Sequence, residues 1–384
     1  MKYIFLIILF YLLIFGCSNP QAESGKEVKE TLTTIDLTEL PTNENLVPLS
    51  QFASEITYFP LGTNEDCLVG PSARFYVYDS LIVCCAHHQI LTFNAANGEF
   101  IRSVGEYDRG PEGFVNSLSS YKKKGNIIIT AIGWQYPYIE LSANGNILNK
   151  FDPPNYSSDL AWLSDNLYVI YYKKNSNSDS LRIQIYDSNE NKIVSTFYDY
   201  RKFDDTSKYT MFSAIFYYYG NKLFIKEYFN DTVFHVTPEK LVPTIIFNSG
   251  KYSPPFYDKD KIIPADYYNI RNIIETNKLI FFQLLFNKKS YYSFFDKRTE
   301  QVMVPNNKNF KVNGFENDID GFMPFQPTSV SSKNKLVGVL EAYQIKKWFN
   351  ENPGKAAKLP SHLQKFKNID ENDNPVLMLV KLKE

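Results

Sequence analysis

The chain has 384 residues, of which 44% are hydrophobic and 22% are charged, and its formal net charge is -1. This composition excludes an intrinsically disordered chain. The near-zero charge excludes a strong electrostatic grip on nucleic acid, so no nucleic-acid partner is expected. Aromatic residues make up 16% of the chain and are mostly Phe and Tyr, which favour strands because broad rings pack well on a pleated surface.

The N-terminus has the pattern of an export signal. Met1-Lys2 begins the chain with a positive charge, and residues 3–15 follow without any charge. That run is shorter than the roughly 20 residues that span a membrane, so residues 1–16 are predicted to be a signal peptide. The junction Ile14-Phe15-Gly16-Cys17 resembles a bacterial lipobox, in which the cysteine carries a diacylglycerol and becomes the new N-terminus. A plain signal peptide and an N-terminal anchor helix are the alternatives.

Lipidation at Cys17 predicts an exported protein whose partner is the outer membrane, held there by acyl chains and facing either the periplasm or the cell surface. Residues 17–34 are polar and almost lack large apolar side chains, so they predict a flexible tether. Residues 35–384 are predicted to form one folded domain.

A pattern of short apolar strands recurs along this domain. Each of the three clearest copies has two strands, a polar turn and a third strand, in that order. The first copy lies at residues 79–84, 90–93, 96–98 and 100–104. The second lies at 126–130, 138–141, 143–145 and 147–151, and the third at 166–170, 183–186, 189–191 and 193–197. Weaker copies lie at residues 222–247 and 278–304, and residues 335–340 open a sixth. Gly98 and Gly145 are 47 residues apart, and Asn-Gly at both turns favours the positive φ of a type I′ hairpin. A period of about 40–50 residues predicts an all-β fold, a single six-bladed β-propeller.

Further segments predict how the ring is closed and where helices are inserted. Residues 56–61 form a strand with no blade of their own, and residues 375–382 form a strand that finishes the sixth copy. We expect the first to pair beside the second as the outermost strand, since this covers exposed edges. Helical spacing at residues 341–352, and a second short stretch at 359–366, predict a helical insertion in the last blade.

Several phrases are similar to those of the six-bladed β-propeller lipoproteins of Bacteroidetes, whose blades resemble NHL repeats. The matching phrases lie at residues 56–63, 91–105, 109–114, 230–234, 317–321 and 374–377. The resemblance covers about residue 35 to the C-terminus and implies the propeller fold and export, without implying a biochemical role. Glu112 departs from the pattern, because such loops more often carry a second Gly there.

Two polar loops are candidate sites. Arg109 and Glu112 lie in an Arg-Gly-Pro-Glu-Gly loop that joins two blades, where Arg109 can face an anionic ligand at the channel mouth, although Gly and Pro also simply shape such a crossing. Asp318 and Asp320 place oxygen ligands close together, as a Ca²⁺ site requires, but Ser329 stands where an EF-hand loop has its Glu. Turns stabilised by Asp and Asn side chains explain the same residues without a metal. The sequence suggests no cofactor other than this Ca²⁺.

Other reactive or aromatic residues have structural explanations. Cys67, Cys84 and Cys85 permit either one disulfide with a free thiol or three buried thiols. His87 and His88 follow the cysteine pair, but alternation along a strand leaves too few ligands on one side for zinc. The aromatic groups at 217–219 and 291–292 are either blade packing or stacking platforms for sugar rings.

The sequence lacks the usual hydrolase motifs, and it has four His, which makes a catalytic triad hard to build. The favoured hypothesis is a membrane-tethered binding or scaffolding module that is not an enzyme, with a glycan, a peptide or an envelope protein as its partner. The alternative is a lyase or hydrolase that acts on carbohydrate with carboxylates from different blades at the channel mouth.

Overall fold

The computed structural model of the protein describes residues 32–39, 47–70, 72–110, 112–133, 137–153, 159–172, 181–198, 214–228, 230–254, 267–305 and 314–383. The predicted signal peptide, the lipidation site Cys17 and most of the predicted tether lie outside these ranges. Among the described residues, no helix is both long and apolar enough to cross a membrane.

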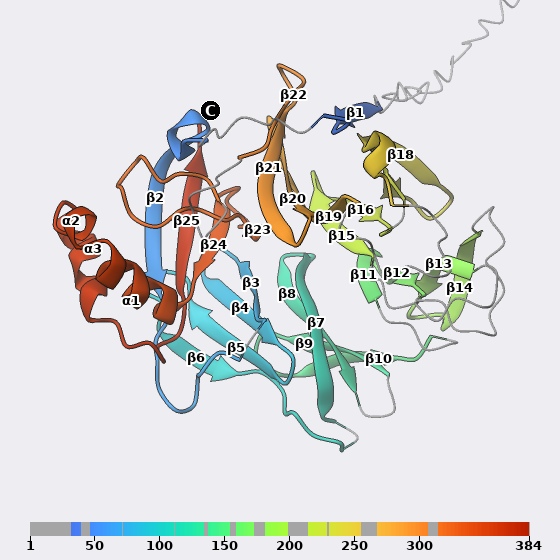
Figure 1. The fold of residues 1–384 in the computed structure, drawn as a ribbon. Helices are drawn as coiled ribbons and strands as arrows, with labels where there is room; N and C mark the ends of the chain where they lie inside the picture. Colours follow the sequence, from blue (N-terminus) through green and yellow to red (C-terminus); the bar gives the residue numbers. More distant parts are fainter. Residues whose placement is uncertain are drawn as a thin grey trace, which may run out of the picture. The chain divides into compact units, whose positions relative to one another are not determined.

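Residues 32–383 contain six sheets arranged as the blades of a propeller ring, as the repeat predicts (Figure 1). The first strands of consecutive blades contact one another, for example β23 with β3 and β3 with β7, and are therefore innermost. The strands are β3 (Arg74–Val77), β4 (Leu81–Ala86), β5 (Gln89–Asn94) and β6 (Phe100–Ser103) in the first blade; β7 (Phe114–Lys123), β8 (Asn126–Gly133), β9 (Tyr138–Ser142) and β10 (Ile147–Phe151) in the second; β11 (Asp159–Ser164), β12 (Leu167–Tyr171), β13 (Leu181–Asp187) and β14 (Lys192–Tyr198) in the third; β15 (Ile215–Tyr219), β16 (Lys222–Lys226), β17 (Thr232–Val236) and β18 (Leu241–Asn248), with β1 (Thr33–Asp36), in the fourth; β19 (Asn269–Glu275), β20 (Leu279–Phe286), β21 (Lys289–Asp296) and β22 (Gln301–Met303) in the fifth; and β23 (Ser329–Val330), β24 (Leu336–Leu340), β25 (Val376–Leu382) and β2 (Ala53–Pro60) in the sixth.

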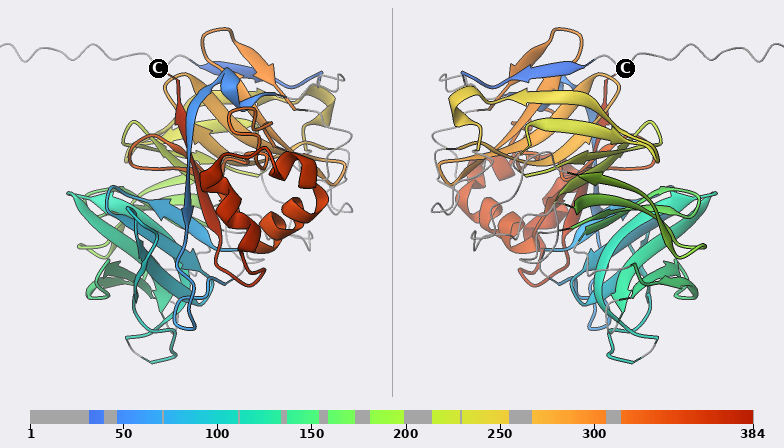
Figure 2. Two further views of the ribbon diagram at one scale, coloured as in Figure 1. Left: turned by 90° about the vertical axis from the view of Figure 1, so that its left-hand side faces the viewer. Right: turned by 90° about the vertical axis from the view of Figure 1, so that its right-hand side faces the viewer.

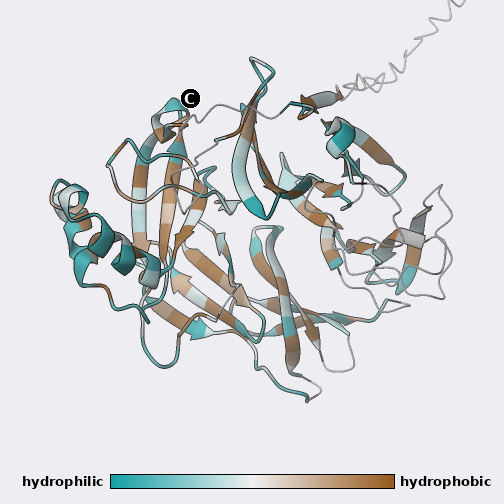
Figure 3. Cartoon of the chain, viewed as in Figure 1, coloured by the Kyte–Doolittle hydropathy of each residue, from teal (hydrophilic) through white to brown (hydrophobic). Residues whose placement is uncertain are grey.

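The core lies between blades because side chains alternate along each strand. On β4, Ile82 and Cys84 pack against the sixth blade, whereas Val83 and Cys85 pack against the second. A hydrophobic cluster of this kind fills each junction around the ring. Figure 3 shows the result, with hydrophobic residues along the strands and hydrophilic ones on the helices.

The ring closes as predicted. Strand β2 pairs antiparallel with β25, from Ala53 opposite Leu382 to Pro60 opposite Val376, and is the outermost strand of the sixth blade. The end of β2 also meets the first blade at the turn that holds Gly98, where an added Cβ would lie 2.1 Å from the Pro60 carbonyl oxygen. Gly98 therefore permits a close approach that joins the last blade to the first.

The two Asn-Gly turns differ from the predicted type I′ geometry. Positive φ is confined to the glycines, 78° at Gly98 and 92° at Gly145, and Asn97 and Asn144 do not have it. The connections span more than two residues between strands, and such longer hairpin loops need positive φ only at the glycine.

The helical insertion lies between β24 and β25, as expected. It comprises α1 (Ala342–Glu351), α2 (Pro353–Ala356), α3 (Ser361–Gln364) and the 3₁₀ turn η3 (Lys365–Asn368). Ile345 and Phe349 of α1 are buried in the cluster between the fifth and sixth blades. Figure 2 shows the helices beside β2, on the outer side of the last blade. Two further 3₁₀ turns, η1 (Leu49–Gln51) and η2 (Gly250–Tyr252), complete the helical elements of the described ranges.

Two features were not expected from the sequence. Each blade has an innermost strand that the repeat did not reveal, so a blade contains four strands where three were predicted. In addition, β1 pairs parallel with β18, with Ile35 fully buried opposite Phe247, as a fifth strand of the fourth blade.

Candidate functional site

One face of the ring carries the connections best placed to bind a ligand. Since the strands of a blade alternate in direction, the turn between its second and third strands opens on the same face as the crossing to the next blade. We call this the loop face. In the first blade it carries the β4–β5 turn at residues 87–88 and the β6–β7 loop at residues 104–113.

The β6–β7 loop contains the predicted site residues Arg109 and Glu112, both exposed. The loop doubles back on itself, because the backbone N–H of Phe114 donates to the Glu106 carbonyl oxygen at 2.9 Å and the Asp108 N–H donates to the Phe114 carbonyl at 3.2 Å. A Cβ on Gly113 would lie 2.5 Å from the Asp108 carbonyl oxygen, so the close return requires glycine.

Sequence reasoning missed a stack of aromatic rings beside this loop. The rings of His87 and His88 lie 4.0 Å apart, and that of Tyr107 lies 4.2 Å from His88. All three are exposed, Tyr107 by 52% of its surface. His87 Nδ1 is 2.9 Å from the amide oxygen of Asn116 on β7, which fixes the imidazole against the second blade. The sequence of the two histidines bears only on zinc binding, and nothing in it indicates that Tyr107 lies beside them.

The innermost strand of the first blade carries polar side chains on the side that faces the second blade. Phe75 and Val77 of β3 pack toward the sixth blade, so Arg74, Tyr76 and Tyr78 project from the opposite side of the chain. Register places Arg74 opposite Cys85, two residues before His87. Arg74 is exposed and lies at the loop-face end of β3.

Tyrosines of the first and fourth blades lie close to one another. Burial raises the pKa of Tyr218 on β15 above its usual range, and the nearby Tyr76 and Tyr78 of the first blade raise it further. Tyr218 still exposes 38% of its surface, which we assign to the channel, and its hydroxyl donates to the Trp162 carbonyl oxygen at 2.6 Å. The raised pKa keeps this hydroxyl protonated near neutral pH.

The other tyrosines considered as stacking platforms pack within or between blades. Tyr217 is 7% exposed and donates to a Glu275 carboxylate oxygen at 3.0 Å. Tyr219 lies under the Lys297 ammonium, 4.4 Å from the ring centre. Tyr291 and Tyr292 are half-buried on β21.

Asp318 and Asp320 lie away from the loop of Arg109 and Glu112, in the β22–β23 connection. The Asp318 carboxylate accepts hydrogen bonds from the backbone N–H and the hydroxyl of Ser50. Asp320 accepts from the Tyr58 hydroxyl at 2.9 Å, and both contacts tie the connection to the region of β2. Among the described residues, no group of three or more His, Cys, Asp or Glu side chains is placed to hold a metal, and Ca²⁺ at this loop stays a prediction.

The three cysteines of the domain are buried free thiols in this structure. Burial raises the pKa of Cys85 to about 12, against the opposing effect of Arg74. The Cys85 thiol therefore stays protonated and unreactive at neutral pH.

A buried charge occurs between the fourth and fifth blades. Lys226, at the loop-face end of β16, is 2% exposed, and its ammonium donates to the Glu227 carbonyl oxygen at 3.2 Å. Burial lowers the pKa of Lys226 to about 8, and Asp231 and Glu227 partly oppose this. Burial also raises the pKa of Asp231.

This lysine predicts an alkaline increase in stability. Between pH 8 and 10.5 the unfolded chain binds one more proton at Lys226 than the folded chain, so the free energy of unfolding rises with pH there and is flat just below pH 8. At 1.36 kcal/mol per pKa unit the full rise is about 3 kcal/mol. Urea unfolding of the full chain in detergent at pH 7 to 9.5 measures the part of this rise between pH 8 and 9.5, about 2 kcal/mol. Lys226→Met should remove the rise, Lys222→Met on the exposed start of the same strand should keep it, and an unchanged rise in Lys226→Met would refute the assignment.

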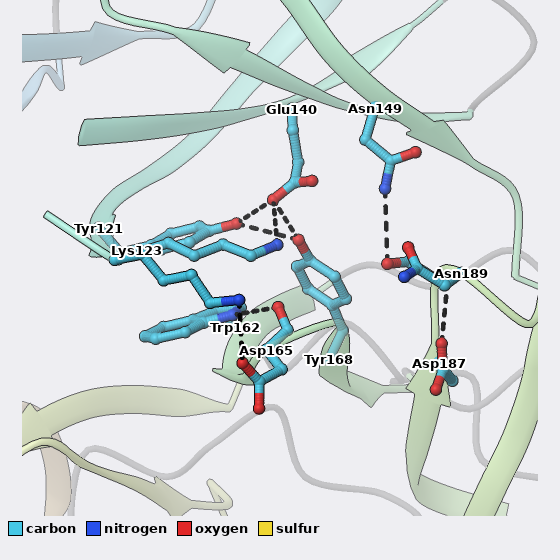
Figure 4. A network of polar contacts seen from close by, with 11 residues as sticks. Tyr121, Lys123, Glu140, Asn149, Trp162, Asp165, Tyr168, Asp187 and Asn189 are labelled. Atoms are coloured by element: carbon cyan, nitrogen blue, oxygen red, sulfur yellow. Dashed lines mark hydrogen bonds and ion pairs between the residues drawn. The ribbon is translucent and has the colours of Figure 1, made fainter. Parts of the chain in front are cut away.

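Figure 4 shows a second buried polar network, between the second and third blades. Glu140 on β9 is 3% exposed, and its Oε1 accepts hydrogen bonds from the hydroxyls of Tyr121, at 2.6 Å, and Tyr168. The Lys123 ammonium lies 3.5 Å from the same oxygen. Burial raises the pKa of both tyrosines above the usual range, so their hydroxyls remain donors. Because donors of the protein itself surround this carboxylate, we assign it to blade packing.

The comparisons with known proteins concern the fold and the family. The chain is similar to a crystal structure from Bacteroides fragilis described as a "Putative exported protein", with 17% identity, a TM-score of 0.70, and coverage of 92% of this chain and 100% of that one. A member of the duf4221 family from Bacteroides vulgatus matches with 11% identity and a TM-score of 0.46, over 89% of this chain and 99% of the other. No curated protein matches. The family described as "Domain of unknown function (DUF4934)" matches residues 32–381, so the chain belongs to the DUF4934 family.

Proposed function

We propose that the protein is an exported lipoprotein, anchored to the outer membrane through Cys17, whose propeller binds a saccharide at the loop face and does not catalyse a reaction. The anchor rests on the lipobox-like residues 14–17. Export is also supported by the similar Bacteroides fragilis protein, whose description includes export. The saccharide rests on one observation, the exposed stack of His87, His88 and Tyr107.

Packing does not account for this stack. Tyr107 lies on a loop with 52% of its surface exposed, although burying an aromatic ring is favourable. The His88 imidazole holds the Tyr107 ring in a solvent-exposed position. The ring therefore offers a flat apolar face that can pack against the C–H groups on one face of a sugar ring. Polar groups beside it, the Asn116 amide and the side chains of Arg109 and Glu112, can bond sugar hydroxyls.

Tyr107→Ala is expected to weaken saccharide binding at least about tenfold, which corresponds to roughly 1.4 kcal/mol of lost stacking. The measurement is binding of the full chain, in detergent, to a panel of oligosaccharides, followed by titration calorimetry of those that bind. Tyr343→Ala is the matched control, since Tyr343 on α1 is 55% exposed and belongs to the helical insertion of the sixth blade, outside the aromatic stack. The proposal is wrong if no oligosaccharide binds, or if both variants bind as the unmodified chain does. Mass spectrometry of the purified chain tests the lipid on Cys17 separately.

A further inference from the structure

Arg74 is a cation without a countercharge. It lies at the loop-face end of the innermost strand β3 and is exposed. Among the described residues, no carboxylate lies within ion-pair distance of its guanidinium, which has the uncharged Tyr76 hydroxyl as a hydrogen-bond partner. A guanidinium stays charged at any physiological pH and presents paired N–H donors that match a carboxylate.

The neighbours of Arg74 on β3 and β4 add no negative charge to its surroundings. The neighbouring Tyr76 hydroxyl accepts a hydrogen bond from the Arg74 side chain, and burial raises its pKa above the usual range, so it is uncharged at neutral pH. Cys85, opposite Arg74 in register, is 2% exposed, packs between the first and second blades and carries no charge at neutral pH. The lining at this point of the channel therefore favours an acceptor that carries negative charge.

Arg74 is continuous with the aromatic stack. The strand pairing that sets Arg74 opposite Cys85 places His87 two residues further along, at the start of the β4–β5 turn. Asn116 and Ser117 of β7 hold this turn, by the contact to His87 and by a hydrogen bond from the Ser117 hydroxyl to the Ala86 carbonyl oxygen. A line of groups thus runs from Arg74 in the channel mouth, through His87 and His88, to Tyr107 at the rim.

We infer that the saccharide is acidic, with a sugar ring on the stack of His88 and Tyr107 and a carboxylate bound by Arg74 at the channel mouth. The inference rests on the proposed saccharide-binding function and adds the ligand's charge to it. The guanidinium forms two hydrogen bonds to the carboxylate oxygens, and the ring stack selects the sugar. Uronate-containing oligosaccharides have this combination of groups.

The test compares uronate oligosaccharides with the same oligosaccharides after reduction of their carboxyl groups to alcohols. The full chain in detergent is expected to bind the acidic form at least tenfold more tightly. Arg74→Gln should remove this preference and leave the affinity for the reduced form unchanged. Arg102→Gln, an exposed arginine on the outermost strand β6 of the same blade, should keep the preference. Melting temperatures of both variants establish that they are folded.

The outcomes separate this inference from the function on which it rests. Equal binding of acidic and reduced forms that still depends on Tyr107 overturns the acidic ligand and leaves saccharide binding in place. A preference for the acidic form that survives Arg74→Gln overturns the role of Arg74. Failure of both forms to bind overturns the proposed function together with the inference.

Discussion

Replacing residues 53–60 by a glycine–serine sequence of equal length is expected to abolish the cooperative unfolding transition of the full chain. These residues form β2, whose backbone pairs with β25 along its whole length. Loss of the strand removes half-buried side chains such as Ile56 and Tyr58 from the cluster between the fifth and sixth blades. Each contributes about 1 to 2 kcal/mol by burial, and the strand's hydrogen bonds add to this.

Strand β2 also contacts two other parts of the ring, and this increases the loss of stability expected when it is replaced. Its end contacts the Gly98 turn of the first blade, and the Tyr58 hydroxyl donates to Asp320 in the β22–β23 connection. Removing the strand therefore opens the ring between its last and first blades and exposes the edge of β25. A loss of about 5 kcal/mol or more would consume most of the stability of an ordinary domain.

The control replaces residues 33–36, the strand β1, in the same way. That strand is added outside a blade whose own four strands are complete, so a smaller decrease and a retained cooperative transition are expected. Circular dichroism during thermal unfolding distinguishes the two variants. A cooperative transition near the original temperature after loss of β2 would show that closure by this strand does not hold the ring together.

Glu140→Leu is expected to lower the free energy of unfolding by about 3 to 5 kcal/mol, because removing one partner of a buried polar network leaves the others unpaired. The leucine would face the hydroxyls of Tyr121 and Tyr168, which lose the Glu140 carboxylate as acceptor; they lie 3.0 Å apart, so one can still donate to the other while the second stays unpaired inside the packed junction shown in Figure 4. Lys123 is 18% exposed at its side chain and can turn to solvent. Urea unfolding of the full chain measures the change.

A combined variant tests the cause of this loss. Tyr121→Phe and Tyr168→Phe added to Glu140→Leu remove the unpaired hydroxyls, and replacing a whole polar network by apolar groups is often close to neutral. The triple variant is therefore expected to recover a large part of the stability lost in Glu140→Leu. If the triple variant is less stable than Glu140→Leu alone, the loss arises from poor packing of leucine at residue 140 and not from unpaired donors.

Candidate site residues were harder to predict than the fold. Arg109 and Glu112 were found because Gly and Pro punctuate their loop, and the structure places both on the exposed loop face. Arg74 and Tyr107 belong to no sequence motif. For His87 and His88, the sequence bears only on a zinc site, and it argues against one. Their relation depends on the pairing of β3 with β4 and on the return of the β6–β7 loop to Phe114, which bring together residues from 74 to 116.

The sequence by itself determined the repeat, the blade count, the closing strand and the helical insertion. Local patterns in the sequence carry these features: short apolar runs, glycine at the turns, and helical spacing after residue 341. A blade must hide both faces of its sheet against its neighbours, so a regular period of such runs leaves few folds available.

Only the tertiary structure decided the innermost strands and the buried polar networks. Strand β7 reads Phe-Val-Asn-Ser-Leu-Ser-Ser-Tyr-Lys-Lys, and it lacks an apolar run because part of its surface faces polar groups of the first blade, such as the Tyr78 hydroxyl beside Ser120. Glu140 and Lys226 look like surface residues in sequence, yet the ring buries both. The physical reason is that burial in a propeller is created between blades about 40–50 residues apart, so it cannot be inferred from any one strand.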